Sequence, residues 1–218
     1  MKKVFLIYML AAGLCAAGLF VSSAAAQAAK GKVYFAGYLG LNLSQDHDFV
    51  DSGLGDDGDI ELDSSASFAG ALGLRLNKQL RLEAELSYSN PDIGDLNLKT
   101  GGAFASSGNL SSYIGMVNLY YDVPVQWQVK PFLSAGMGYG VFDADFNDAG
   151  SGVNNFSESD GAFTWQLGAG FQYETSENLS FTAGYQYLNA GTLEFNDVDI
   201  DYDNHVLRVG LRYELPYK

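Results

Sequence analysis

Carboxylates are the side chains of this 218-residue chain with the clearest chemical potential. Twenty of the 26 Asp and Glu residues fall within four segments, 44–64, 89–109, 143–160 and 189–204, where Lys99 is the only Lys or Arg. Because hard divalent cations bind carboxylate oxygens, the densest strings predict loosely held calcium or magnesium. The candidate ligands are Asp56, Asp57, Asp59, Asp199, Asp201 and Asp203. The alternative is a set of solvated, mutually repelling loops, and no other cofactor is expected.

Histidine is the other residue type suited to chemistry near neutral pH, and the chain has only His47 and His205. A lipid-directed barrel enzyme, such as a lipid A deacylase or a palmitoyl transferase, needs a His close to a Ser and a carboxylate. Neither His is followed by Ser at the second position, as an H-x-S pairing would require. We therefore expect no catalytic residues and no enzyme activity.

The elements that position these groups are strands, because apolar and polar residues alternate with period two in eight blocks. The blocks are Val33–Leu43, Ser67–Leu76, Leu80–Tyr88, Tyr113–Val123, Leu133–Val141, Phe163–Glu174, Leu179–Tyr187 and Leu207–Leu215. Each is close to the ~9–11 residues that cross a bilayer as a tilted strand. Only Ile114 and Met116 depart clearly from their block's pattern. The sequence predicts an all-β fold, an eight-stranded antiparallel up-and-down barrel that spans a membrane.

The composition of the two strand faces indicates which side meets lipid. One face of the blocks is Leu, Phe, Val and Tyr, whereas the other is rich in Gly, Ser, Gln, Arg and Glu. A soluble ligand-binding barrel would turn the polar face to water, but a water-exposed face so rich in Gly would be unusual. Aromatic residues near both strand ends, such as Trp127 and Trp165, fit two interfacial girdles. A membrane barrel is therefore favoured over a soluble one.

The first 26 residues have the layout of a cleavable signal peptide. Lys2 and Lys3 precede an apolar run, and small residues follow it, with A-x-A sites that predict cleavage after Ala26 or Ala28. An uncleaved anchor is the alternative, but the run is barely long enough to span a bilayer. The only cysteine, Cys15, leaves with the signal, so no disulfide is expected. Residues 27–218 are predicted to form one domain in a Gram-negative outer membrane.

The connections between blocks alternate strictly in length. Segments 77–79, 124–128 and 175–178 are short, and they alternate with the four acidic segments. Barrels of the outer membrane place short turns in the periplasm and long loops outside. We therefore expect the four acidic segments to be extracellular loops, both termini to be periplasmic, and the protein to be a monomer.

Charged residues on the inward face of the blocks form a second candidate site. They are Arg75, Arg81, Glu83, Glu85, Asp122, Lys130, Glu174, Arg208, Arg212 and Glu214. An unpaired charge in a narrow lumen costs several kcal/mol, so these residues predict a structural network of ion pairs, with Glu85 and Arg208 as candidate partners. A small polar pore is the alternative, because the same residues would line one.

Two stretches resemble the opacity-protein-like family of outer-membrane β-barrels. They are MVNLYYDVPVQWQVKPFLSAGMGYG, from Met116, and HVLRVGLRYELPYK, from His205. In that family an N-x-Y-Y-D strand precedes a P-aromatic-x-x-x-G-x-G strand, and the last strand ends V-G-x-R-Y-x-F; here Leu215 replaces the final Phe. The resemblance implies a small adhesin-like surface barrel that meets the barrel-assembly machinery through its C-terminal strand.

The favoured function is a non-enzymatic surface barrel that contributes to envelope integrity or adhesion through its acidic loops. A narrow channel for small solutes is the alternative, and a lipid-modifying enzyme is the third reading. The expected partners are outer-membrane lipids, including lipopolysaccharide, and an extracellular ligand that the sequence does not identify. With a net charge of −14, nucleic acid is not an expected partner.

Overall fold

The computed structural model describes residues 32–43, 45–51, 56–98, 102–104, 106–148, 156–195 and 198–216. The predicted signal peptide and both of its cleavage sites lie outside these residues. No helix in the described part of the chain is long and apolar enough to cross a membrane.

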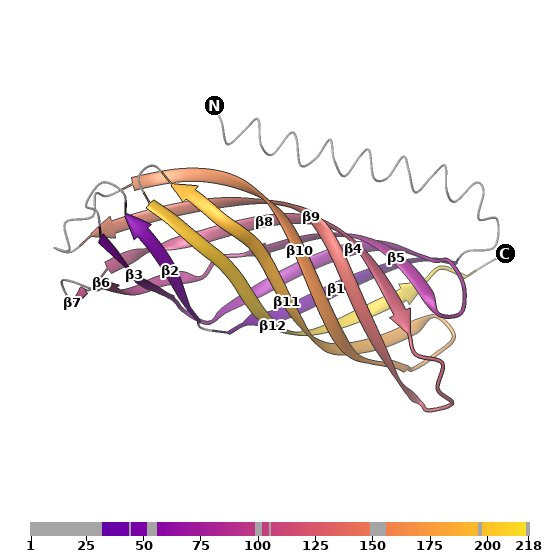
Figure 1. The fold of residues 1–218 in the computed structure, drawn as a ribbon. Helices are drawn as coiled ribbons and strands as arrows, with labels where there is room; N and C mark the ends of the chain where they lie inside the picture. The colour runs from indigo at the N-terminus through magenta and orange to yellow at the C-terminus, as the bar shows by residue number, and fades with distance from the viewer. Residues whose placement is uncertain are drawn as a thin grey trace.

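The described residues form strands joined by turns (Figure 1). The strands are β1 (Lys32–Asn42), β2 (Gln45–Asp51), β3 (Asp56–Leu62), β4 (Ser65–Arg75), β5 (Leu80–Ser89), β6 (Asp92–Leu98), β7 (Gly102–Phe104), β8 (Ser106–Asp122), β9 (Val129–Asp148), β10 (Phe156–Glu174), β11 (Leu179–Phe195) and β12 (Val198–Glu214).

Eight of these strands form the closed antiparallel barrel that the alternation predicts. The order is β1-β4-β5-β8-β9-β10-β11-β12, and β12 pairs with β1 from Tyr34↔Glu214 to Asn42↔Val206, which closes the barrel. The three short connections lie at the end of the barrel where β1 begins and β12 finishes, called here the turn end. The opposite end is called the hairpin end (Figure 1).

The two faces of the barrel wall follow the predicted alternation, because successive side chains on a strand point to opposite sides. Large apolar side chains are exposed on the outer face, for example Phe35, Met137 and Leu167, while the inner face is buried and mostly polar. Ile114 and Met116, which depart from their block's pattern, are buried inside the barrel. The predicted eight-stranded architecture is confirmed.

The four acidic segments contain strands, where the sequence analysis expects loops. Strands β8 to β12 continue beyond the apolar belt, the band of exposed apolar side chains on the outer face. Strands β2, β3 and β6 extend β1, β4 and β5 in the same direction. Short breaks after Asn42, Leu62 and Ser89 separate the members of each pair. Pairing of β12 with β2, β2 with β3, β3 with β6 and β6 with β8 extends the wall at the hairpin end. The physical reason is that alternation persists here, with acidic residues outward and apolar residues inward, as in Asp199 to Tyr202.

Gly138 on β9 illustrates how closely the strands of this narrow barrel pack. A Cβ at Gly138 would overlap the carbonyl oxygen of Gly115 and approach the Cα of Met116 to 2.8 Å. Since both neighbours are backbone atoms, Gly138→Ala should destabilise the barrel by about 1–3 kcal/mol in urea titration of the detergent-folded protein. Gly70→Ala is the matched control, because a Cβ at Gly70 meets nothing within 4 Å. Equal stability of the two variants would contradict this packing.

Candidate functional site

The inner face of the barrel gathers eight of the ten charged residues that the sequence assigns to the lumen. This lumen charge network consists of Arg75, Arg81, Glu83, Glu85, Asp122, Arg208, Arg212 and Glu214. Its four guanidinium groups face four carboxylates, so the network is electrically balanced. Strands β4, β5, β8 and β12 supply these residues. Every second side chain of each strand points into the barrel, so the charged positions of the four strands share one interior.

Ion pairs join most members of the network. Arg81 Nη2 lies 2.8 Å from Asp122 Oδ1, and its Nε also donates to this carboxylate. Arg75 bridges Asp122, at 3.2 Å, and Glu214, at 2.6 Å. Hydrogen-bonded ion pairs of this kind compensate for the cost of burying charge.

Glu85 and Arg208 form a separate pair, with Arg208 Nη2 at 3.1 Å from Glu85 Oε2. Their side chains are only 4% and 9% exposed. Asn118 donates to the same Glu85 oxygen at 3.2 Å, and Arg208 also donates to Gln186. The candidate partnership of Glu85 and Arg208 is therefore present in the structure.

Three tyrosines that the sequence analysis does not single out complete the network. The hydroxyl groups of Tyr34, Tyr38 and Tyr120 donate to the Glu83 carboxylate at 3.0–3.3 Å. Among the described residues, no guanidinium forms an ion pair with Glu83, so the tyrosines supply its hydrogen-bond donors. Their inward parity is the signal that could have identified them, because a buried tyrosine hydroxyl needs a polar partner.

Aromatic rings also cover the guanidinium groups. Arg208 lies with its Cζ 3.7 Å from the centre of the Tyr38 ring, and Arg81 lies 4.5 Å from that of Tyr120. Cation–π contacts of this kind are stronger when desolvated. The Nε of Arg212 is the one buried side-chain polar atom without a hydrogen-bond partner in the described part of the chain. The network is thus tightly filled but imperfectly satisfied at Arg212.

Lys130 and Glu174, the other two predicted lumen residues, are not part of the buried network. They form an ion pair with each other, 2.6 Å from Nζ to Oε2, near the turn end. Their side chains are 32% and 42% exposed. Water therefore screens this pair. The pair lies at the rim of the lumen.

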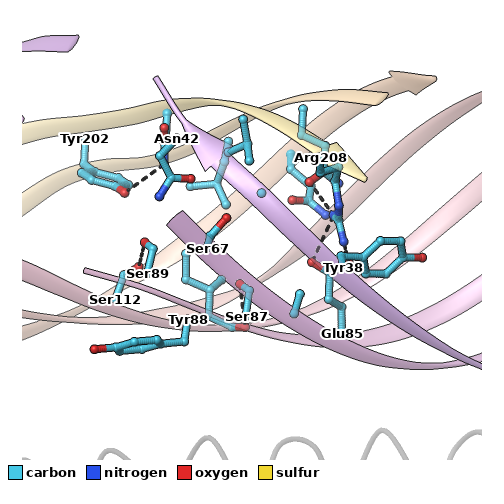
Figure 2. Close-up of a pocket in the computed structure, with 18 residues that line it drawn as sticks. Tyr38, Asn42, Ser67, Glu85, Ser87, Tyr88, Ser89, Ser112, Tyr202 and Arg208 are labelled. Atoms are coloured by element: carbon cyan, nitrogen blue, oxygen red, sulfur yellow. Dashed lines mark hydrogen bonds and ion pairs between the residues drawn. The ribbon is translucent and has the colours of Figure 1, made fainter. Parts of the chain in front are cut away.

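A small polar chamber lies between the network and the hairpin end (Figure 2). Its volume is about 50 Å³, enough for a few water molecules. Glu85 and Arg208 lie on one side of it and Tyr202 on the other, as Figure 2 shows. The polar groups that line it include Asn42, Ser67, Ser87, Ser89, Ser112 and Gln166. The chamber is therefore a site for water or a very small polar solute.

From the level of this chamber toward the hairpin end, the interior contains an apolar cluster, called here the apolar plug. Its members are Leu62, Ile93, Leu110, Ile114, Met116, Phe142, Ala144, Ala162, Leu188, Ala190, Leu193, Ile200 and Tyr202. The rings of Phe142 and Tyr202 lie 5.0 Å apart, and Phe142 and Leu193 are completely buried. Burial raises the pKa of Tyr202 to about 12, so its hydroxyl stays protonated at neutral pH. The lumen is thus apolar at one end and charged at the other.

The predicted cation ligands divide into two groups. Side chains of Asp56, Asp57 and Asp59, on β3, lie outside the described part of the structure. Asp199, Asp201 and Asp203 lie on β12, where the first two are exposed and Asp203 is 32% exposed. Asp201 accepts a hydrogen bond from Thr192 at 2.6 Å. Within the described residues, no three His, Cys, Asp or Glu side chains gather closely enough to hold a metal ion. Cation binding at these residues stays a prediction.

Of the two histidines, only His205 has side-chain contacts in the described part of the structure, and these are with Tyr and Asp residues. The side chain of His47 lies outside the described part of the structure. His205 Nδ1 contacts the Tyr185 hydroxyl, and its Nε2 lies 4.0 Å from Asp203 Oδ2. These contacts place His205 on the outer wall, among aromatic side chains.

Residues 12–214 match the model of the family described as outer membrane protein beta-barrel domain. Among curated relatives, the outer membrane protein PagN of Salmonella typhimurium is 27% identical over 147 residues, which cover 62% of this chain and 62% of PagN. The 31 kDa outer-membrane immunogenic protein of Brucella melitensis is 26% identical over 198 residues, 82% of each chain.

Two solved structures share the fold. The outer membrane protein OprG from Pseudomonas aeruginosa is 16% identical with a TM-score of 0.61, and covers 86% of this chain and 97% of its own. Neisserial surface protein A is 18% identical with a TM-score of 0.56, and covers 84% and 97%. At this level of identity, the likeness concerns the architecture of the barrel only.

Proposed function

Because this chain belongs to the family of outer-membrane protein β-barrel domains, we propose that it is a non-enzymatic surface barrel without an open pore, which contributes to envelope integrity or adhesion. The observation that carries this proposal is the double obstruction of the lumen. The lumen charge network fills one level and the apolar plug fills another, with a chamber of only about 50 Å³ between them. Solute passage would require both levels to rearrange.

The proposal includes an orientation. The turn end would face the periplasm, and the hairpin end would face the outside, as in other outer-membrane barrels. The polarity of the hairpin end is compatible with this orientation, because it suits a part of the barrel that stands in water. The hairpin end has an apolar interior and an acidic exterior, which suits water, whereas the rest of the barrel has the inverse arrangement. The protein would be a monomer in contact with lipopolysaccharide, assembled through its C-terminal strand.

Conductance across a planar bilayer tests the proposal against the alternative of a narrow channel. We expect the purified mature barrel to insert without discrete conductance steps in potassium chloride, because Arg81, Glu83 and Phe142 are buried in the lumen. Heat-denatured protein and a protein-free bilayer serve as controls. Reproducible unitary steps from the wild-type barrel would contradict the closed lumen and favour the channel.

The acidic hairpin end supports a second expectation, the binding of divalent cations. Glu194 pairs directly with Asp199 across β11 and β12, and like charges opposite each other destabilise a sheet. Calcium at about 1 mM should relieve this repulsion and protect the hairpin end from proteinase K. The triple variant Asp199→Asn, Asp201→Asn, Asp203→Asn should lose that protection.

Glu177→Gln is the matched control for the cation experiment, because Glu177 is an exposed carboxylate at the turn end. Its protection by calcium should equal that of the wild type. Protease sensitivity that does not change with calcium would show that the carboxylates are simply solvated.

A further inference from the structure

The outer wall of β10, β11 and β12 carries a group of aromatic and polar side chains at the edge of the apolar belt. It consists of Trp165, Tyr185, Tyr187, Asn189, Asp203 and His205, called here the aromatic–acid patch. Two adjacent cross-strand rows build it, because Trp165 pairs with Asn189 and Asn189 with Asp203, while Tyr187 pairs with His205. Residues directly opposite on neighbouring strands lie within about 5.5 Å, so the patch is continuous.

The rings of the patch contact one another. Trp165 and Tyr187 lie 5.6 Å apart with an interplanar angle of 62°, and Tyr187 and His205 lie 5.2 Å apart. The Tyr185 hydroxyl contacts His205 Nδ1. Side chains of His205 and Asp203 are 34% and 32% exposed. The patch therefore offers preorganised ring faces next to a carboxylate and an amide.

The aromatic–acid patch lies where the outward-facing residues of β12 change from apolar to polar. Leu207 and Val209 are exposed apolar residues of the belt, whereas the next outward positions toward the hairpin end are His205, Asp203 and Asp201. The patch therefore lies where an apolar environment gives way to a polar one. In a membrane this is the level of the lipid headgroups, where Trp and Tyr concentrate.

An apolar groove on the outer wall leads away from the patch toward the turn end. Its volume is about 850 Å³, and it shares Tyr185 with the patch. Small residues, Ala169 and Ala183, lie between larger ones on the same outer face. Leu39, Leu133, Phe171 and Leu207 are among those larger residues. A second groove of about 540 Å³ shares Leu39, Phe171 and Ala183 with it and continues in the same direction.

We infer, on the orientation proposed above, that the patch and the groove together form a binding site for a glycolipid of the outer leaflet. A sugar ring of the headgroup stacks on Trp165 and Tyr187, and its hydroxyl groups hydrogen-bond to Asp203 and Asn189. An acyl chain lies in the groove below Tyr185. The chemistry selects a sugar rather than a bare phosphate, because the patch offers a carboxylate and no Lys or Arg.

The fluorescence of Trp165 gives a direct test, because the chain has only two tryptophans and Trp127 lies in a turn at the other end of the barrel. In a Trp127→Phe background, the refolded barrel in detergent is titrated with rough-type lipopolysaccharide, phosphatidylglycerol or delipidated core oligosaccharide. We expect a saturable emission change with lipopolysaccharide and affinities at least about tenfold weaker for the other two. Equal responses to lipopolysaccharide and phosphatidylglycerol would overturn the proposal.

Variants separate the two halves of the site. Tyr187→Leu and Asp203→Asn should weaken lipopolysaccharide binding about tenfold. Ala183→Phe should weaken it similarly by filling the groove, but should leave the response to free oligosaccharide unchanged. Tyr113→Leu is the matched control, because Tyr113 is an exposed aromatic residue that contacts Tyr88 on another part of the wall. Unchanged affinity in Tyr187→Leu, Asp203→Asn and Ala183→Phe, each with the gel mobility of the folded barrel, would refute the site.

Discussion

Replacing Glu85 by Gln is expected to lower the free energy of unfolding by about 3–5 kcal/mol. The reason is that Gln removes the carboxylate that pairs with Arg208 at 3.1 Å and leaves a guanidinium that is only 9% exposed without its counter-charge. Gln186 and the ring of Tyr38 stay beside Arg208, but neither carries a compensating negative charge. Urea titration of the detergent-folded barrel, followed by the mobility difference between unheated and boiled samples, measures the loss.

A double-mutant cycle separates the pair from its surroundings. Arg208→Met alone should also destabilise the barrel, but adding it to Glu85→Gln should restore part of the loss, with a coupling energy of about 1–3 kcal/mol. Glu174→Gln is the control, because its exposed pair with Lys130 should contribute less than about 1 kcal/mol. Simple additivity of the changes at Glu85 and Arg208 would show that the two charges are not coupled.

Phe142→Ala is expected to destabilise the hairpin end by about 3–5 kcal/mol. Phe142 is completely buried in the apolar plug and packs against the ring of Tyr202. Truncation removes a large apolar side chain and leaves a cavity beside the polar chamber, which water can then enter. Hydrogen exchange of the backbone amides in β9 and β12 measures the local loss of stability.

The response of other parts of the barrel distinguishes this effect from general unfolding. Amides near the lumen charge network should keep their protection in Phe142→Ala, because Arg81 and Asp122 pair with each other and neither belongs to the plug. Phe142→Met retains most of the volume and should cost less than about 1.5 kcal/mol. If the alanine and methionine variants behave alike, the plug does not pack as a close-fitting core.

The barrel itself could be predicted from the sequence because period-two alternation is a local property. Each residue's face depends only on its position along its own strand, so the inward direction of Arg81, Glu83 and Glu85 follows from the block 80–88. Ile114 and Met116 depart from the apolar-outward pattern of their block, and the structure shows them buried at the inward positions that parity gives them. In the acidic segments Asp, Val, Ile and Tyr also alternate, but their acidic composition predicted loops, and the structure has strands there instead.

Apart from the candidate pair of Glu85 and Arg208, contacts across the lumen could not be predicted, because they depend on how neighbouring strands are staggered. Glu85 and Arg208 are 123 residues apart, and parity gives their direction but not their relative height. The stagger of the strands, which closes the barrel, sets the relative height of Glu85 and Arg208. It also brings Tyr34, Tyr38 and Tyr120 to Glu83. Lys130 and Glu174 share the inward parity, yet they meet at the rim because their strands position them near the turn end.

The sequence by itself determined the eight strands of the barrel and the polarity of each wall face, since alternation along each strand is sufficient for these. Only the tertiary structure decided which residues meet from different strands. It placed the apolar plug on the hairpin-end side of the lumen charge network. It also joined Trp165, Tyr187 and Asp203 into one surface beside an apolar groove. The physical reason is that register and closure are collective properties of all eight strands, which no single segment encodes.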